Sequence, residues 1–252
     1  PIIMTSGLNF FHTWRWGYVV VGIAQLVLAL CFALTIKMWK REKAAADQDE
    51  HKRLTDYETS LGETLRQLPV WLSLLLFFLY TGTEITLGSW AYTLLTESRG
   101  VAEATAGLVA GSYWATFTVG RVLAGLYARR ISLNTLIRGG LLLALSGALL
   151  LWWNPSSTVS VIGVALCGFA VAPIFPALVS GTSKRVGDRF AANTIGMQIG
   201  AAGLGGSIIP GLVGVLARRI SLEVIPVCMV IFALLLLGIY QYAMQKAKSI
   251  EH

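Results

Sequence analysis

Seven long apolar stretches, separated by short polar segments, run through this sequence. A bilayer core about 30 Å thick is crossed by a helix of roughly 20 apolar residues, and each stretch is long enough for that. With 55% hydrophobic and 13% charged residues, a water-soluble fold of 252 residues would lack the polar surface to cover itself. We therefore expect an all-α integral membrane protein with seven transmembrane helices. The stretches cover approximately residues 17–36, 69–95, 104–128, 131–153, 157–181, 191–217 and 221–244.

The Lys and Arg residues lie mostly in the segments between these stretches. The net charge of +7 would suit nucleic acid only if they formed a basic face on a folded domain, so we expect no nucleic-acid partner. If the chain crosses the membrane at each stretch, 14 Lys and Arg residues lie on the same side as residues 37–68, and 4 lie on the other side. Because basic residues gather on the cytoplasmic side, this predicts a multi-pass protein of the cell membrane, surrounded by lipid, with a cytoplasmic C-terminus.

Residues 37–68 form the longest polar segment, with seven basic and seven acidic residues and no proline. We interpret this segment as a solvated, partly helical linker. Elsewhere, the three cysteines lie singly inside apolar stretches and the three histidines lie outside them. Neither type clusters with acidic residues at metal-ligand spacing, and there is no P-loop, so we expect no metal, no cofactor and no enzymatic activity.

Glu84 and Arg121 are charged residues well inside apolar stretches. A charge at a helix centre costs roughly 2.5 to 3.5 kcal/mol on an insertion scale for Asp, Lys and Arg, so it persists where it has a role. Glu84 follows Tyr80 by one turn, and we expect it to carry a coupling proton or bind substrate; the alternative is a structural hydrogen bond. Arg121 either snorkels to the cytoplasmic surface or acts as a gate that binds helix C-termini or a carboxylate in one state only.

Aromatic and amide side chains supply further candidates for a substrate site. Tyr113, Trp114 and Phe117 share one apolar stretch and could stack on a sugar ring, although aromatic residues in membrane helices are also ordinary packing residues. Asn193 and Gln198 are polar residues of another apolar stretch and could donate hydrogen bonds to substrate hydroxyls.

Two prolines interrupt the stretch at residues 157–181. Because Pro173 and Pro176 cannot donate backbone hydrogen bonds, we expect this helix to kink or open near its cytoplasmic half and to act in gating. The stretch at residues 191–217 is rich in glycine, which permits close contact with a neighbouring helix, either static or sliding.

Three motifs resemble the major facilitator superfamily. Trp14-Arg-Trp16 resembles the turn into the sixth helix of that superfamily, and residues 37–68 resemble its central cytoplasmic loop. Gly120-Arg-Val-Leu-Ala-Gly-Leu-Tyr-Ala-Arg-Arg130 is similar to the signature between its eighth and ninth helices, without the acidic residue of the fuller signature. The resemblance implies the end of an N-terminal half at 1–36, a linker at 37–68, and a C-terminal six-helix bundle of two inverted three-helix repeats at 69–252.

Two shorter motifs are similar to the fucose and glucose symporter group. They are Tyr80-Thr-Gly-Thr-Glu84, followed by Gly88-Ser-Trp90, and Gly168-Phe-Ala-Val-Ala-Pro173-Ile-Phe-Pro176. In that group the helix breaks near the Gly-Ser pair, and a break here would bring Trp90 into the site. An internal echo supports the inverted repeat: Ala128-Arg-Arg-Ile-Ser-Leu133 recurs as Ala217-Arg-Arg-Ile-Ser-Leu222, three spans later.

The combined prediction is secondary active transport of a small sugar-like solute by alternating access, with coupling to protons. A complete transporter of this type has twelve helices, so the missing N-terminal half is an expected partner. We expect either a truncated copy or a half-transporter whose partner chain supplies five helices; the other class considered is a seven-helix receptor. Substrate identity, coupling ion and direction of transport stay open.

Overall fold

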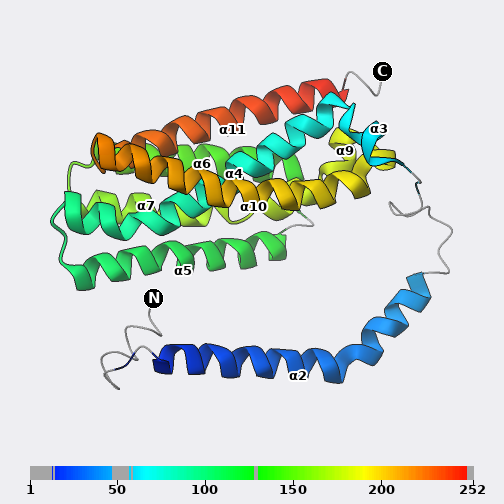
Figure 1. Ribbon diagram of the computed structural model, residues 1–252, viewed down its shortest axis with the longest axis horizontal. Coiled ribbons are helices and arrows are strands. Elements are labelled where there is room, and N and C mark those ends of the chain that lie inside the picture. Colours follow the sequence, from blue (N-terminus) through cyan, green and yellow to red (C-terminus); the bar gives the residue numbers. More distant parts are fainter. Residues whose placement is uncertain (1–12, 14, 47–56, 58, 128–129, 249–252) are drawn as a thin grey trace. The chain divides into compact units, whose positions relative to one another are not determined.

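The computed structural model describes residues 13, 15–46, 57, 59–127 and 130–248, and the regular structure in these residues is helical (Figure 1). The chain divides into two units, Pro1–Asp56 and Tyr57–His252. The described helix of the first unit is α2, Arg15–Ala46, which is 32 residues long. Its apolar side chains are largely exposed, Leu26 at 71% and Leu34 at 75%, so this helix is suited to lipid or to a further protein surface.

The second unit is a bundle of long helices joined by short connections (Figure 1). Its long helices pack side by side, and α4 contacts α10, α11 and α5, while α7 packs between α5 and α6. In chain order the described elements are α3 (Leu61–Leu65), α4 (Leu68–Thr93), the π-helix η2 (Leu94–Ser98), α5 (Glu103–Tyr127), α6 (Leu133–Trp153), α7 (Ser157–Val171), α8 (Ile174–Ser180), α9 (Thr182–Val186), α10 (Asp188–Arg219) and α11 (Val224–Lys248).

Six of the described helical segments are long and apolar enough to cross a membrane. They match the predicted stretches except residues 104–128. A 25-residue helix, α5, does occupy that place, but it is not among the segments that are apolar enough by this measure. The integral, all-helical class is confirmed, whereas the seventh span and the inverted-repeat arrangement stay predictions. Residues 128 and 129 of the repeated hexapeptide lie outside the described residues.

The segment predicted as a linker is helical in part. Helix α2 continues to Ala46, ten residues beyond the predicted end of the first span, and the short helix α3 begins at Leu61. The side chain of Ser60 caps α3 by accepting a hydrogen bond from the backbone N–H of Glu63. Residues 47–56 of the linker lie outside the described part of the chain, and the domain boundaries at 36 and 68 stay predictions.

Glycine allows α4 and α10 to approach closely. The Cα of Gly205 lies against the backbone of Phe78, so an added Cβ would be 2.0 Å from the Phe78 carbonyl oxygen. Gly82 on α4 meets the side chain of Ile209 in the same way. Gly203, by contrast, has nothing within 4 Å of where its Cβ would be. The glycine-rich stretch therefore serves tight packing at some positions and presents a flat, open surface at others.

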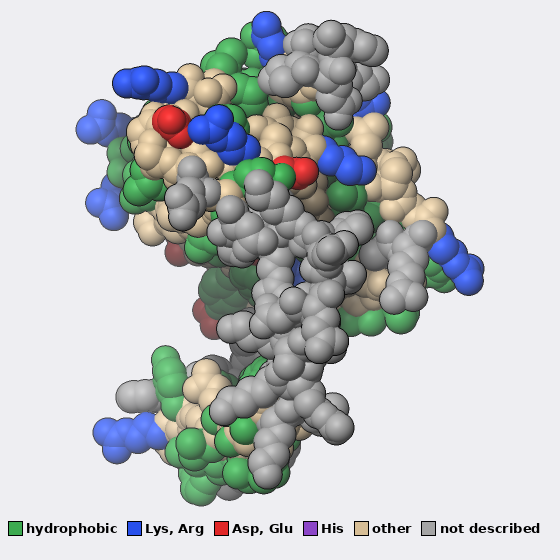
Figure 2. All heavy atoms as spheres, turned by 90° about the vertical axis from the view of Figure 1, so that its right-hand side faces the viewer, with side chains coloured by type: hydrophobic (Ala, Val, Ile, Leu, Met, Phe, Trp, Pro, Cys, Tyr) green, Lys and Arg blue, Asp and Glu red, His purple; other side chains and the backbone are tan. Residues whose placement is uncertain are grey.

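Basic side chains gather at one end of the bundle. Figure 2 shows this end, where Lys and Arg residues surround the described ends of α3, α9 and α11. The exposed members include Arg66, Lys184, Arg189 and Lys246. This arrangement agrees with the side that the charge count assigns to the cytoplasm, and the orientation itself stays a prediction.

Candidate functional site

The helix formed by residues 157–180 is broken at its two prolines. Helix α7 ends at Val171 and α8 begins at Ile174, as the proline pair predicts. In an unbroken helix the carbonyl of residue i accepts a hydrogen bond from the N–H of residue i+4. Pro173 and Pro176 have no N–H, so the carbonyls of Phe169 and Ala172 cannot be satisfied in that way. The break therefore presents backbone oxygens inside the bundle.

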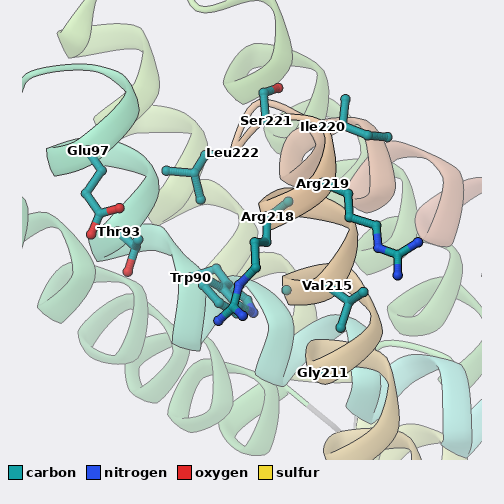
Figure 3. A pocket seen from close by; sticks show the side chains of 12 residues that line it. Trp90, Thr93, Glu97, Gly211, Val215, Arg218, Arg219, Ile220, Ser221 and Leu222 are labelled. Atoms are coloured by element: carbon teal, nitrogen blue, oxygen red, sulfur yellow. The ribbon is translucent and has the colours of Figure 1, made fainter.

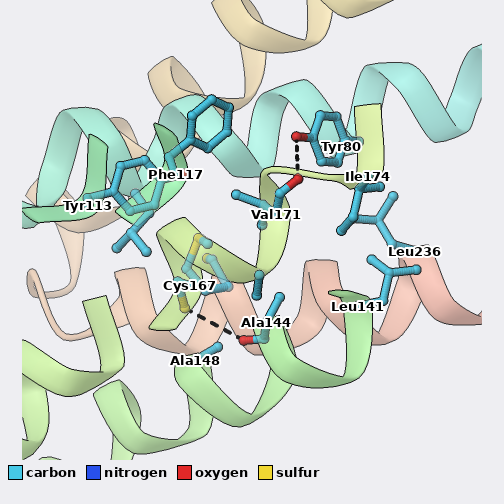
Figure 4. Close-up of a cluster of buried hydrophobic side chains, with 14 of the residues drawn as sticks. Tyr80, Tyr113, Phe117, Leu141, Ala144, Ala148, Cys167, Val171, Ile174 and Leu236 are labelled. Carbon is cyan, nitrogen blue, oxygen red and sulfur yellow. Dashed lines mark hydrogen bonds between the residues drawn. The ribbon is translucent and has the colours of Figure 1, made fainter. Parts of the chain in front are cut away.

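Side chains from two neighbouring helices bind this break. The Tyr80 hydroxyl of α4 donates to the Val171 carbonyl oxygen at 2.8 Å (Figure 4). The Arg121 Nε of α5 donates to the Ala172 carbonyl oxygen at 3.4 Å, and its guanidinium lies 4.5 Å from the centroid of the Phe117 ring. A cation at a helix C-terminus is favoured by the helix dipole. Arg121 thus donates a hydrogen bond to the Ala172 carbonyl oxygen, which lacks its helical donor because Pro176 has no N–H.

Glu84 lies on the same helix as Tyr80 and within electrostatic reach of Arg121. It follows Tyr80 by one turn of α4 and is half-buried, so its carboxylate stays accessible from outside the bundle. The carboxylate interacts with the Tyr80 hydroxyl and lies within electrostatic reach of Arg121. Among the described residues Glu84 forms no direct ion pair, since the paired carboxylates are those of Glu223 and Glu63. The structure therefore brings Tyr80, Glu84 and Arg121 together around the break.

The three aromatic residues of α5 adjoin this group. The Tyr113 hydroxyl donates to the backbone carbonyl of Glu84 at 2.9 Å, and the Tyr113 side chain is only 1% exposed. Trp114 and Phe117 meet edge to face, with ring centroids 5.7 Å apart. The Trp114 ring also fills the space that a side chain would take at Gly88. Tyr113 is thus a packing residue here, and Trp114, which is partly exposed, is the better placed to meet a solute.

Trp90 lies apart from this group. Helix α4 is unbroken through Thr93, so the helix break expected at the Gly88-Ser89 pair does not occur. The Trp90 indole Nε1 donates to the Pro210 carbonyl of α10 at 3.1 Å, and its ring packs on Gly214. Trp90 also lines a cavity of about 910 Å³ between the ends of α4 and α10, together with Arg218 and Glu97 (Figure 3). Tyr80, Glu84 and Arg121 are not among its lining residues.

The two amide residues of α10 also have partners elsewhere. The Asn193 side chain donates to the Thr59 carbonyl at 2.8 Å and to the Thr64 hydroxyl at 3.2 Å, which ties α10 to α3. The Gln198 side chain is fully buried and donates to Ser73 at 2.6 Å. Ser73 precedes Glu84 by 11 residues, roughly 16 Å along the axis of α4. The structure therefore does not bring these two candidate site residues together with Glu84.

A buried arginine cluster was not identified from the sequence. Arg185 of α9 is 3% exposed and donates to the Leu178 carbonyl at the end of α8 and to the hydroxyls of Thr182 and Ser73. Gln198 belongs to the same cluster through Thr182. Burial lowers the pKa of Arg185 to about 10, so the guanidinium stays charged near neutral pH. Arg185 lies in a short polar segment between two apolar stretches, where no local pattern indicates its burial.

A second cluster closes the opposite end of the bundle. Arg99, next to the end of η2, forms a bidentate pair with Glu223, with Nη2–Oε2 2.7 Å and Nε–Oε1 3.0 Å. Arg99 also donates to the Ser160 hydroxyl and the Leu151 carbonyl. The hydrogen bonds from Arg99 hold the pKa of Glu223 below its ordinary value. In the described part of the chain, no three His, Cys, Asp or Glu side chains gather as a metal site.

Comparison with known proteins gives one family and several relatives. The family model described as Major Facilitator Superfamily matches residues 1–210. Bypass of stop codon protein 6 of Saccharomyces cerevisiae is 31% identical over 187 residues, which are 68% of this chain and 37% of that protein. Sodium-dependent glucose transporter 1 of Homo sapiens is 30% identical over 210 residues, 81% of this chain and 38% of that protein. Sodium-dependent glucose transporter 1A of Mus musculus is 27% identical over 209 residues, 80% and 45% respectively. The chain thus spans less than half the length of these relatives.

Proposed function

Because the chain belongs to the major facilitator superfamily, a family of membrane transporters and not of enzymes, we propose that it contributes one half of a secondary transporter for a small sugar-like solute. Transport proceeds by alternating access between two helical bundles. The bundle of residues 57–252 is one of them, and the rest of a longer protein or a partner chain supplies the other. Family membership sets aside the alternative of a seven-helix receptor.

The observation that carries this proposal is the group of Tyr80, Glu84 and Arg121 around the broken helix. Discontinuous helices form the substrate and ion sites of many secondary transporters, because the break leaves backbone oxygens available for ligands. Here the break lies beside an accessible carboxylate and the partly exposed ring of Trp114. A sugar needs such a combination, since its hydroxyls require polar partners and its axial hydrogens pack on aromatic faces. The gating role of Arg121, Pro173 and Pro176 is part of this proposal.

Sodium is the coupling ion in this proposal. Two of the relatives are named as sodium-dependent glucose transporters, and those names give no support to the proton coupling predicted from the sequence. A univalent ion that crosses a membrane at 100 mV yields about 2.3 kcal/mol, enough for a concentration ratio of roughly fifty. One ion per sugar therefore suffices for uphill transport.

Uptake of labelled glucose by cells that express the complete coding sequence tests the proposal. We expect accumulation above the external concentration with an inward sodium gradient and none when choline replaces sodium. Glu84→Gln should abolish this accumulation. Glu97→Gln, which changes an exposed carboxylate in the π-helix η2 that follows α4, should leave it unchanged. Glucose accumulation by the Glu84→Gln variant at the level of the unchanged protein would contradict the role of Glu84.

The isolated chain of residues 1–252 provides a second test. Alternating access requires two bundles that rock about a site between them, so liposomes that contain only this purified chain should not take up solute. Saturable uptake by such liposomes would show that one bundle is sufficient and would overturn the proposed mechanism.

A further inference from the structure

We propose that the Glu84 carboxylate, with the hydroxyl oxygens of Tyr80 and Thr81, binds the sodium ion, and that Arg121 is the cation that replaces sodium when the ion leaves. This inference rests on the proposed function and names the ion site within it. All four residues belong to this chain, so the site is complete without a second bundle.

Glu84 needs a cation that the described bundle does not provide by direct contact. A buried or half-buried carboxylate in a membrane helix is stabilised by pairing with a positive charge. Arg121 is near enough to act through its charge, yet its guanidinium lies on the Phe117 ring and its Nε binds the Ala172 carbonyl. Among the described residues, the carboxylate therefore has no cation in direct contact.

Two hydroxyl oxygens beside Glu84 are available as ligands. The Tyr80 O–H points to the Val171 carbonyl, which leaves the lone pairs of its oxygen free to face the neighbouring carboxylate. The Thr81 Oγ1 is buried and has no hydrogen-bond partner in the described structure. Tyr80 and Thr81 lie four and three residues before Glu84, the two spacings that place helix side chains next to one another. Oxygen atoms of these kinds are the ligands that hard cations prefer.

The end of α7 adds a favourable electrostatic field. The C-terminal carbonyls of a helix carry partial negative charge, and half-helix C-termini coordinate sodium in known transporter folds. The Val171 and Ala172 carbonyls lie at such an end, and both already accept hydrogen bonds from the residues of this group. The Ala172 carbonyl already accepts a hydrogen bond from a cation, the guanidinium of Arg121.

Arg121 and sodium compete because they carry the same charge near one carboxylate. Arg121 is exposed and has a long, flexible side chain, so it can turn from the Ala172 carbonyl toward Glu84 when the ion is absent. Bound sodium would keep Arg121 on the carbonyl and so hold the helix break in the arrangement seen here. A change at Arg121 that shifts the balance between these two arrangements must therefore change the affinity for sodium.

Binding of radioactive sodium to the purified chain in detergent tests the site. We expect saturable binding that Glu84→Gln removes and that Thr81→Val weakens about five-fold or more. Thr83→Val is the matched control, because the Thr83 hydroxyl bonds to the Leu79 carbonyl of its own helix, and it should leave the affinity unchanged. Arg121→Met should raise the affinity about five-fold or more, whereas Arg121→Lys, which keeps the charge, should not.

The results separate this inference from the proposed function. Absence of saturable sodium binding to the chain, unchanged binding by Glu84→Gln, or weaker binding by Arg121→Met would overturn the site. If the complete protein still accumulates glucose on a sodium gradient in that case, transport stands and the ion binds elsewhere. Sodium binding that depends on Glu84, without glucose accumulation by the complete protein, would instead support the site and contradict the proposed transport. Should Glu84→Gln fail to fold, the Thr81 and Arg121 variants decide the outcome.

Discussion

Arg99 holds several helices together at one end of the bundle through a single guanidinium. Its side chain is 5% exposed and that of Glu223 is 41% exposed, so the burial of this ion pair is intermediate between that of a core pair and that of a surface pair. We expect Glu223→Gln to lower the free energy of unfolding by about 1 kcal/mol at neutral pH, after allowance for solvent screening. Because the pKa of Glu223 is lowered in the folded state, this stability is present above the ordinary glutamate pKa and is lost as the pH falls through the lowered value.

Thermal unfolding in detergent between neutral and acidic pH measures this effect. The difference between the unchanged protein and Glu223→Gln should shrink as the pH falls below the ordinary glutamate range. Glu97→Gln is the matched control, since Glu97 lies at the same end of the bundle and forms no ion pair with any other described residue. A difference that grows toward acidic pH would contradict the sign derived for Glu223.

For individual side chains, the sequence predicted which residues are neighbours within one helix but not which residues of other helices they contact. Tyr80 and Glu84 are adjacent because helical spacing alone requires it. Gln198 and Asn193 were expected at a substrate site because polar residues in an apolar stretch need partners. The nature of those partners, Ser73 and Thr59, depends on how α10 packs against distant segments, which no local pattern reveals. The burial of Arg185 also depends on contacts with other helices, so it could not be predicted from the sequence around Arg185.

Packing of whole helices was predictable in kind but not in detail. The glycine content of residues 191–217 predicted close contact, and the structure shows which positions make it. Gly205 lies against the Phe78 backbone, whereas Gly203 faces open space. The proline pair likewise predicted the break between α7 and α8. The first apolar span ends at Ile36 as predicted, and helix α2 continues to Ala46 because charged residues can extend a helix that has left the apolar region.

Gly205→Ala and Gly203→Ala form a matched pair that tests the contact between α4 and α10. The added methyl group at position 205 would clash with a backbone oxygen that cannot move alone, so α4 and α10 must separate. We expect Gly205→Ala to destabilise the protein by about 1 to 3 kcal/mol, measured by thermal unfolding in detergent. Gly203→Ala should be neutral or slightly stabilising, because alanine favours the helix and nothing obstructs it. Equal losses for both variants would contradict this account of the interface.

For the whole molecule, the decisive property is which end of the bundle faces the cytoplasm. The basic end shown in Figure 2 carries the exposed Lys184, Arg189 and Lys246, whereas the other end carries the paired Arg99 and Glu223. Basic residues gather on the cytoplasmic side of membrane proteins, so we expect the basic end inside. Single cysteines in a variant that lacks the three natural ones allow a direct test in intact cells. A cysteine at Lys246 should react with an impermeant maleimide only after permeabilisation, and one at Ser157 should react before it. The reverse pattern would invert the topology and place the broken end of α7, with Glu84 and Arg121, in the opposite half of the membrane.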